Sequence, residues 1–476
     1  MGSNIIGSTI GSIIDSMDLN TYIQNFKLDD KADKNKFGII YTSFVIINKM
    51  LDLIPDVCYT NPLTTWLDMG AGTGYFSICL FRRLDKGLKN VIICEDERRA
   101  HIISNMLYMS EIKESHVIVL RQIFGQNANI YGDFLSLSEN SFGFAFDFII
   151  GNPPYNCDGQ IKCPSNKLIK KKDEGKTVWP RFIKKALLLL KDGGHLCPII
   201  PSIWLKPDKA GIYEVLTKYK INALHTLSNT ETNKIFNYEA QTPTCFFLLQ
   251  KTNPGFNREI NIYDKFLREY CIYKYDYGSA IPLHGITILN KLQVFVKKYG
   301  MLPVVKTNCP SKKSLFALEH SSDYPYKNIA TCLLDGLNPI LKVNYSNIPQ
   351  SGYNVKKLVL AHKMYGFPYL DLSGDYGISA RDNYIITDLN NLTFIRDFLS
   401  TKLALFIYSC ASYRMKYLEK YAFEFIPDIS KMDWSTISIS SSNKKIDDDV
   451  LAELFGLTFR EREIIEGMHK DYSRFG

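Results

Sequence analysis

Short apolar runs alternate with amphipathic stretches along the first half of the chain. The runs predict buried strands at Thr65–Asp68, Asn90–Asp96, His116–Leu120, Phe144–Ile150, His195–Ile200, Ile221–Leu227 and Thr244–Leu249. Apolar residues that recur every three or four positions predict helices at residues 44–54, 75–84, 98–110 and 179–190. Apolar strands that alternate with helices are typical of a parallel sheet buried on both faces. We therefore expect an α/β fold with a mostly parallel, seven-stranded sheet.

This alternation ends near Thr252. Tyrosines, short β-like runs and irregular turns continue from there, and Leu392–Ser409 is the clearest helical stretch. A chain of 476 residues is also too long for one compact core. We expect an N-terminal extension at residues 1–36, a first domain at 37–255 and a mixed α+β domain at 256–476.

Composition and charge narrow the class of protein. Hydrophobic residues at 46% and charged residues at 22% are typical of a globular protein, and the net charge of +8 favours a polyanionic partner. Residues 1–20 lack a basic segment followed by an unbroken apolar run, so we expect no signal peptide and no membrane span, and an intracellular location. The closest cysteines, Cys157 and Cys163, do not have a zinc-site spacing, so no metal is expected.

A glycine-rich turn follows the first predicted strand. Gly70, Gly72 and Gly74 let the backbone approach a ligand closely, and the next helix offers unpaired N–H groups. Their spacing is tighter than the dinucleotide fingerprint, which argues against a pyrophosphate ligand. Glu95 and Asp96, at the end of the second predicted strand, are placed to hold ribose hydroxyls. Alternatively, these acids begin a helix.

A stiff corner, Gly151-Asn152-Pro153-Pro154-Tyr155, follows the Phe144–Ile150 strand. Two consecutive prolines remove two backbone donors and fix two φ angles, so the strand must stop there. The corner then presents an amide and an aromatic ring at the carboxyl end of a strand, which is where α/β sheets bind ligands. An ordinary loop breaker is the alternative.

Together these motifs resemble the S-adenosylmethionine-dependent adenine-N6 DNA methyltransferases of the γ class, which occur in restriction–modification systems. The resemblance covers roughly residues 37–250 and implies a Rossmann-like methyltransferase domain followed by a target-recognition domain. It implies that Asn152, Pro153, Pro154 and Tyr155 are catalytic. It also implies cofactor contacts from Tyr41, Thr42, Asp68, Gly70, Gly72, Glu95, Asp96, Asp133 and Phe134. Ser43 stands where the family's Tyr-Thr-Pro motif has proline.

The resemblance also implies a mechanism. The Asn152 side-chain oxygen and the Pro153 carbonyl would accept hydrogen bonds from an adenine amino group and thereby direct its lone pair at the cofactor's methyl group. The target nucleotide would be flipped out of the duplex and stacked between Tyr155 and Phe236. Core aromatic residues are the alternative interpretation of both rings.

Basic residues suggest where DNA is held. Lys170 and Lys171 lie in a lysine-rich insertion after the corner, and Arg414 and Lys416 lie between tyrosines in the second domain. A solvated loop and an amphipathic helix are the respective alternatives.

We expect double-stranded DNA as substrate, a monomer, and a separate restriction endonuclease as a further partner. An RNA base methyltransferase and a non-catalytic nucleic-acid-binding subunit remain alternative functions. A release-factor glutamine methyltransferase is disfavoured by the long second domain.

Overall fold

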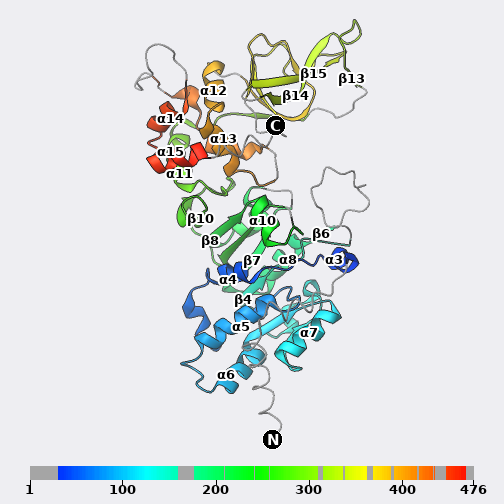
Figure 1. The fold of residues 1–476 in the computed structure, drawn as a ribbon, viewed down its shortest axis with the longest axis vertical. Coiled ribbons are helices and arrows are strands. Elements are labelled where there is room, and N and C mark those ends of the chain that lie inside the picture. The colour runs from blue at the N-terminus through cyan, green and yellow to red at the C-terminus, as the bar shows by residue number, and fades with distance from the viewer. Residues whose placement is uncertain are drawn as a thin grey trace. The chain divides into compact units, whose positions relative to one another are not determined.

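A computed structural model describes residues 31–158, 176–207, 210–240, 242–256, 258–308, 315–335, 338–361, 368–387, 391–414, 418–432, 434 and 446–467. The chain divides into two compact units, which Figure 1 shows as ribbons. The first unit is Met1–Tyr263 with Lys274–Gly278, and the second is Asp264–Tyr273 with Ser279–Gly476.

The first unit is built on a large, mostly parallel sheet. Its strands lie in the order β10 (Glu259–Asp264), β8 (Lys220–Leu227), β9 (Thr244–Gln250), β7 (Leu190–Pro201), β4 (Phe146–Gly151), β1 (Trp66–Asp68), β2 (Leu107–Ser110) and β3 (Asn129–Tyr131). Only β9 runs antiparallel to both of its neighbours, β7 and β8. The predicted α/β class is confirmed, and β10 extends the expected seven strands by pairing parallel to β8.

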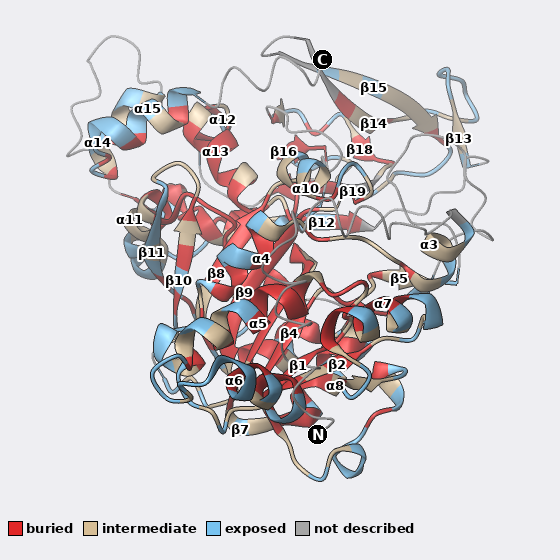
Figure 2. Ribbon diagram, turned by 60° about the horizontal axis from the view of Figure 1, so that its bottom comes forward, coloured by how far each residue is buried: buried red, intermediate tan, exposed pale blue. Residues whose placement is uncertain are grey.

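Helices bury one face of this sheet. Helix α4 (Phe44–Leu51) and helix α5 (Tyr75–Gly87) share a core cluster with Trp66, Phe148 and Ile199 of the strands. Leu67, the residue between Trp66 and Asp68 in β1, is also fully buried, although its side chain points to the opposite face. Burial of both faces explains why these strands are apolar throughout, and Figure 2 shows the buried strands at the centre of the unit.

The predicted strand at Asn90–Asp96 is wrong. Residues 90–94 form turns with Val91 and Ile93 exposed, and Glu95 then begins helix α6 (Glu95–His101). A π-helical turn at Ile102–Met106 leads directly into β2, so the predicted helix at 98–110 actually contains the second strand.

The predicted strand at His116–Leu120 is also wrong, because these residues belong to helix α7 (Glu114–Phe124). The helix buries His116, Val119, Leu120, Ile123 and Phe124, which recur at helical spacing. The third strand is instead β3, immediately before Gly132 and Asp133.

The corner after β4 leads into a short hairpin. Strand β5 (Asn156–Cys157) pairs antiparallel with β6 (Lys176–Thr177), and helix α8 (Trp179–Leu189) follows. Near the N-terminus, helix α3 (Lys31–Phe37) packs against β5.

The second unit is mixed α+β. One sheet has the order β12 (Val305–Asn308), β19 (Arg381–Ile386), β16 (Lys357–Leu360), β17 (Tyr369–Asp371), and another has β13 (Phe316–Ala317), β15 (Asn338–Ser346), β14 (Tyr326–Asp335), β18 (Gly377–Ile378). The unit also contains strand β11 (Glu269–Lys274) and helices α11 (Ile286–Tyr299), α14 (Asp448–Leu454) and α15 (Phe459–Gly467). The helix predicted at 392–409 is two helices, α12 (Leu392–Leu399) and α13 (Lys402–Cys410), because Thr401 caps the second.

A fully buried ion pair stabilises the second unit. Lys357 and Asp371 form it across the β16–β17 pair, and their side chains are 0% and 1% exposed. The Asp371 carboxylate also accepts hydrogen bonds from the backbone N–H groups of Gly374, Asp375 and Tyr376. One carboxylate thus holds the turn between β17 and β18.

Candidate active site

Two turns interlock where β1 and β4 end. The Met69 N–H, just after β1, donates to the Ile150 carbonyl of β4 at 3.0 Å. Gly151 has a φ of +133°, and a Cβ added there would lie 2.9 Å from Asp68 Oδ1. A glycine is therefore required at the last position of β4, both for the backbone angle and for the space.

The Asn152 side chain is held in one orientation. Its Nδ2 donates to the Ile40 carbonyl at 3.2 Å and to Thr42 Oγ1 at 3.0 Å. A carbonyl only accepts hydrogen bonds, so the amide nitrogen must face Ile40 and the amide oxygen must point the other way. That oxygen, Oδ1, is buried and has no hydrogen-bond partner within the described part of the chain. The site therefore contains an oriented acceptor that is ready for a donor.

The segment that holds Asn152 lies very close to the corner. Gly38 has a φ of +69°, and a Cβ there would lie 2.1 Å from the Asn156 carbonyl oxygen. Only glycine permits this approach. Ile39, Ile40, Tyr41 and Thr42 continue along the same side of the pocket.

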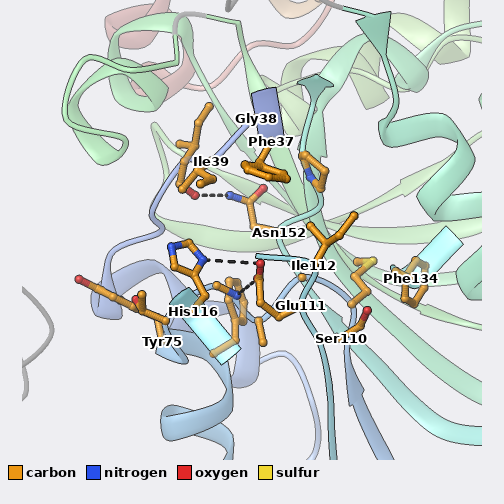
Figure 3. A pocket seen from close by; sticks show the side chains of 18 of the residues that line it. Phe37, Gly38, Ile39, Tyr75, Ser110, Glu111, Ile112, His116, Phe134 and Asn152 are labelled. Atoms are coloured by element: carbon orange, nitrogen blue, oxygen red, sulfur yellow. Dashed lines mark hydrogen bonds and ion pairs between the residues drawn. The ribbon is translucent and has the colours of Figure 1, made fainter. Parts of the chain in front are cut away.

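One pocket joins the two turns and this segment, as Figure 3 shows. Of the predicted site residues, Tyr41, Thr42, Gly70, Gly72, Asp133, Phe134, Asn152 and Pro154 line it. Thr73 also lines it, and its buried Oγ1 has no hydrogen-bond partner among the described residues. The sequence thus predicted residues from four separate segments that the fold brings together.

Asp68 lies beneath this pocket and is absent from the described residues that line it. It is fully buried, and its carboxylate accepts hydrogen bonds from Ser77 Oγ at 2.8 Å and from the Gly70 N–H at 3.4 Å. Burial raises its pKa to about 7 despite these donors. Asp68 therefore helps to fix the conformation of the glycine-rich turn through its hydrogen bond to Gly70.

Glu111 is the acid that the sequence analysis missed. It directly follows β2, lines the pocket and accepts a hydrogen bond from the Gly72 N–H at 2.8 Å. Its other oxygen lies 3.6 Å from His116 Nδ1 and accepts from the Lys113 N–H at 2.8 Å. Glu111 therefore occupies the strand-end position that the sequence predicts for Glu95 and Asp96.

Glu95 and Asp96 instead form the first turn of α6, as the alternative interpretation had it. Glu95 pairs with Arg99 at 2.9 Å, one helical turn further along. Neither acid is among the described residues that line the pocket. Their predicted position at a strand end is wrong, because the strand lies at Leu107–Ser110.

An aromatic stack closes the far end of the pocket. The rings of Phe134 and Phe182 lie 5.3 Å apart and nearly parallel, at 10°. Asp133 precedes Phe134 and accepts a hydrogen bond from the Leu135 N–H at 3.0 Å, which fixes the turn. Phe182 comes from α8 and was not predicted, because nothing in its local sequence links it to residue 134.

Tyr155 and Phe236 lie together but are covered. Tyr155 is 8% exposed and Phe236 is 1% exposed, and their rings meet edge to face at 6.5 Å. The Tyr155 hydroxyl donates to the Ile199 carbonyl at 3.3 Å. In this structure both rings are core aromatics.

The predicted basic contacts are only partly described. Lys170, Lys171 and Lys416 lie outside the described residues. Arg414 is half exposed in the second unit, with its Nε 3.6 Å from Glu419 Oε1. The neighbouring Tyr413 is buried and donates to the Ile281 carbonyl at 2.7 Å, so its ring is part of the core.

The described residues contain no group of three or more His, Cys, Asp or Glu side chains that could hold a metal ion. No helix in the same ranges is both long and apolar enough to cross a membrane.

The sheet order, with its antiparallel β9, and the pocket at the strand ends define a Rossmann-like methyltransferase fold. Residues 93–236 match the family of Eco57I restriction-modification methylases. This segment includes Glu111, Phe134, Asn152 and Phe236, and it begins after the glycine-rich turn.

Two curated relatives share part of the sequence. The type II restriction enzyme and methyltransferase RM.BcgI of Heyndrickxia coagulans is 28% identical over 206 residues, which cover 41% of this chain and 29% of the relative. The type II methyltransferase M.TthHB8I of Thermus thermophilus is 38% identical over 77 residues, or 14% and 18% of the two chains. The chain thus spans less than a third of either relative's length.

Among solved structures, the type IIL restriction-modification enzyme MmeI in complex with DNA is similar over 87% of this chain and 70% of its own. Its sequence identity is 13% and its TM-score is 0.45.

Proposed function

We propose that this protein is a site-specific DNA adenine-N6 methyltransferase that uses S-adenosyl-L-methionine. The observation that carries the proposal is the oriented Asn152 amide, with its nitrogen engaged and its buried oxygen unpartnered at the pocket. An exocyclic amino group supplies the donor that this acceptor lacks. The match of residues 93–236 to restriction-modification methylases supports DNA as the substrate.

The pocket residues fit this cofactor. Phe134 and Phe182 offer apolar ring faces for an adenine, Asp133 a carboxylate for its amino group, and Glu111 a carboxylate for ribose hydroxyls. The orphaned Thr73 hydroxyl and the backbone at Gly70 and Gly72 would hold the polar amino-acid end. Tyr41 and Thr42 would lie along the same end. When bound, S-adenosylmethionine supplies an electrophilic methyl group on its sulfonium sulfur.

The chain's own residues would activate the amine. Its lone pair is delocalised into the base, so the free amine is a poor nucleophile. Asn152 Oδ1 and the Pro153 carbonyl, both acceptors, would draw its two hydrogens into a pyramidal arrangement and release the lone pair. Pro153 and Pro154 keep the corner rigid, so the acceptors need little reorganisation.

A base inside a duplex cannot reach Asn152, so the target nucleotide would have to be flipped into the site. Tyr155 is the last residue of the corner and Phe236 lies edge to face against it, and we assign both rings to the flipped base. Because both rings are buried, the rings or the residues that cover them must move before a base can enter between them. Stacking contributes about 1–3 kcal/mol per base, which would offset this rearrangement.

The second unit is assigned to target recognition, with Arg414 and Lys416 as phosphate contacts. We assign the same role to Lys170 and Lys171, which belong to the first unit. The net charge of +8 fits a DNA partner. We propose an intracellular monomer that works beside a separate restriction endonuclease.

Incubation with labelled cofactor and a mixed pool of duplex DNA and RNA, followed by nucleoside mass spectrometry, tests this function. N6-methyladenine from DNA is expected, and Asn152→Ala serves as the inactive control. Methylcytosine would overturn the adenine assignment, and label in RNA alone would overturn the DNA assignment. A chain that binds DNA but no cofactor, measured by calorimetry, would be a non-catalytic subunit.

A further inference from the structure

Helix α3 is tied to the cofactor end of the pocket. Asp33 Oδ2 accepts from Lys113 Nζ at 2.6 Å. Lys113 is two residues from Glu111 and three from His116, which both line the pocket. This ion pair therefore connects α3 to the segment that contains Glu111.

The same helix is tied to the other end of the site by the next residue. Lys34 forms an ion pair with Glu239, three residues beyond Phe236. The Glu239 N–H donates to the Phe236 carbonyl at 2.9 Å, so the acid belongs to the turn that carries the aromatic ring. Asp33 and Lys34 thus join two segments more than a hundred positions apart in the sequence.

Between these ties, α3 continues into the pocket wall. The Gly38 N–H donates to the Lys34 carbonyl at 2.8 Å and closes the helix, and the Lys36 carbonyl accepts from the Asp158 N–H at 3.2 Å. Phe37 and Gly38 line the pocket (Figure 3). The Ile40 carbonyl and the Thr42 hydroxyl accept hydrogen bonds from the Asn152 amide. The position of α3 therefore determines where residues 38–42 lie, and these residues orient the Asn152 amide.

From this geometry we propose that Asp33 and Lys34 are positioning residues, and that their ion pairs with Lys113 and Glu239 form a clasp holding the 38–42 segment against the corner. The clasp orients Asn152 and closes the pocket wall over the cofactor. This inference rests on the proposed function, since it concerns the same site.

The clasp responds to ionic strength. The four side chains are 13–35% exposed, so solvent and salt reach both pairs. A partly exposed pair of this kind changes an equilibrium by about two- to fivefold, and salt suppresses the effect. The clasp therefore tunes cofactor binding and leaves the fold intact.

Calorimetry with S-adenosylmethionine and initial rates at low and high salt test the clasp in the full chain. Lys34→Glu is expected to weaken cofactor binding about two- to fivefold at low salt and to lower kcat, with little change in the KM for DNA. High salt removes the difference from wild type. The reversed pair, Lys34→Glu with Glu239→Lys, restores both quantities, which loss of fold would not allow.

Lys89→Glu, an equal charge change at an exposed position outside the pocket lining, is the matched control and is expected to behave as wild type. Equal effects of Lys34→Glu and Lys89→Glu, or no rescue by the reversed pair, would overturn the clasp. A wild-type chain that fails to bind the cofactor at all would instead overturn the proposed function.

Discussion

The Thr42 hydroxyl lies 3.0 Å from the Asn152 amide nitrogen and accepts one of its two hydrogens. The Ile40 carbonyl takes the other, at 3.2 Å. A residue from the N-terminal segment thus decides which way an amide more than a hundred positions later presents its oxygen. In the proposed reaction, Thr42 acts on the amine through Asn152.

Replacing Thr42 by valine should lower kcat roughly tenfold, because a buried Nδ2 loses an acceptor and the amide loses its fixed orientation. Valine keeps the shape, so the unfolding transition should stay close to that of wild type. Thr42→Ser keeps the hydroxyl and should retain most of the activity. Single-turnover rates with saturating cofactor measure both variants, and equal rates would contradict the role of the hydroxyl.

Asn152→Ala should reduce methyl transfer by about 100-fold or more, because it removes a preorganised acceptor from the reacting group. Cofactor affinity, measured by calorimetry, should change little. Asp68→Ala should do the reverse and mainly weaken cofactor binding, since Asp68 supports the Gly70 turn from below. Equal loss of cofactor binding in both variants would contradict this division of roles.

Asp68 should make the first unit less stable as the pH rises. Burial is the main cause that raises its pKa in the folded chain from the ordinary 3.8 of an aspartate to about 7. The folded state therefore keeps a proton that the unfolded state has lost between these values. The stabilisation is fully present below about pH 4 and is lost as the pH rises through about 7.

Asp68→Asn removes this titration. Relative to the variant, the wild type should lose about 1 kcal/mol of unfolding free energy per pH unit across that window. Urea unfolding of both proteins at about pH 5 and about pH 8 gives the comparison. A constant difference between the two proteins would show that Asp68 is already charged in the folded state.

Gly38→Ala should disrupt the site, because its Cβ would lie 2.1 Å from the Asn156 carbonyl oxygen. Gly143→Ala is the matched control: its φ of +76° is close to the +69° of Gly38, and a Cβ there meets nothing within 4 Å. The control should cost only backbone strain, about 1 kcal/mol. Gly38→Ala should cost roughly 1–3 kcal/mol more from the clash and should also lower activity. Similar thermal shifts and similar activities would contradict the close approach.

Lys357→Met should destabilise the second unit by about 3–5 kcal/mol, because it leaves the buried Asp371 carboxylate without its counter-charge. Lys342→Met, at an exposed position on β15, should change stability by no more than about 0.5 kcal/mol. Chemical unfolding followed by tyrosine fluorescence compares the two variants. A small effect at Lys357 would mean that Asp371 takes up a proton when its partner is removed.

The sequence predicted the residues whose chemistry is local. The double proline marks the end of β4 whatever surrounds it. Asp133 and Phe134 were predicted through the family resemblance and not from their local chemistry. Glu111 was not predicted, because Val91 and Ile93 suggested a strand although they are exposed residues outside any strand. The actual second strand, Leu107–Ser110, lies within a segment that was predicted to be helical. Phe182 could not be linked to Phe134 without the three-dimensional fold.

The interlock of the two turns also has a consequence for protein engineering. The Met69 N–H donates a hydrogen bond to the Ile150 carbonyl, and Gly151 packs against the Asp68 carboxylate. Each turn therefore forms part of the other's packing surface. A chimera that exchanged residues 68–74 with those of another enzyme, but kept residues 150–155, would join surfaces that had not been selected together. The two segments should be grafted as one module, despite the eighty or so residues between them.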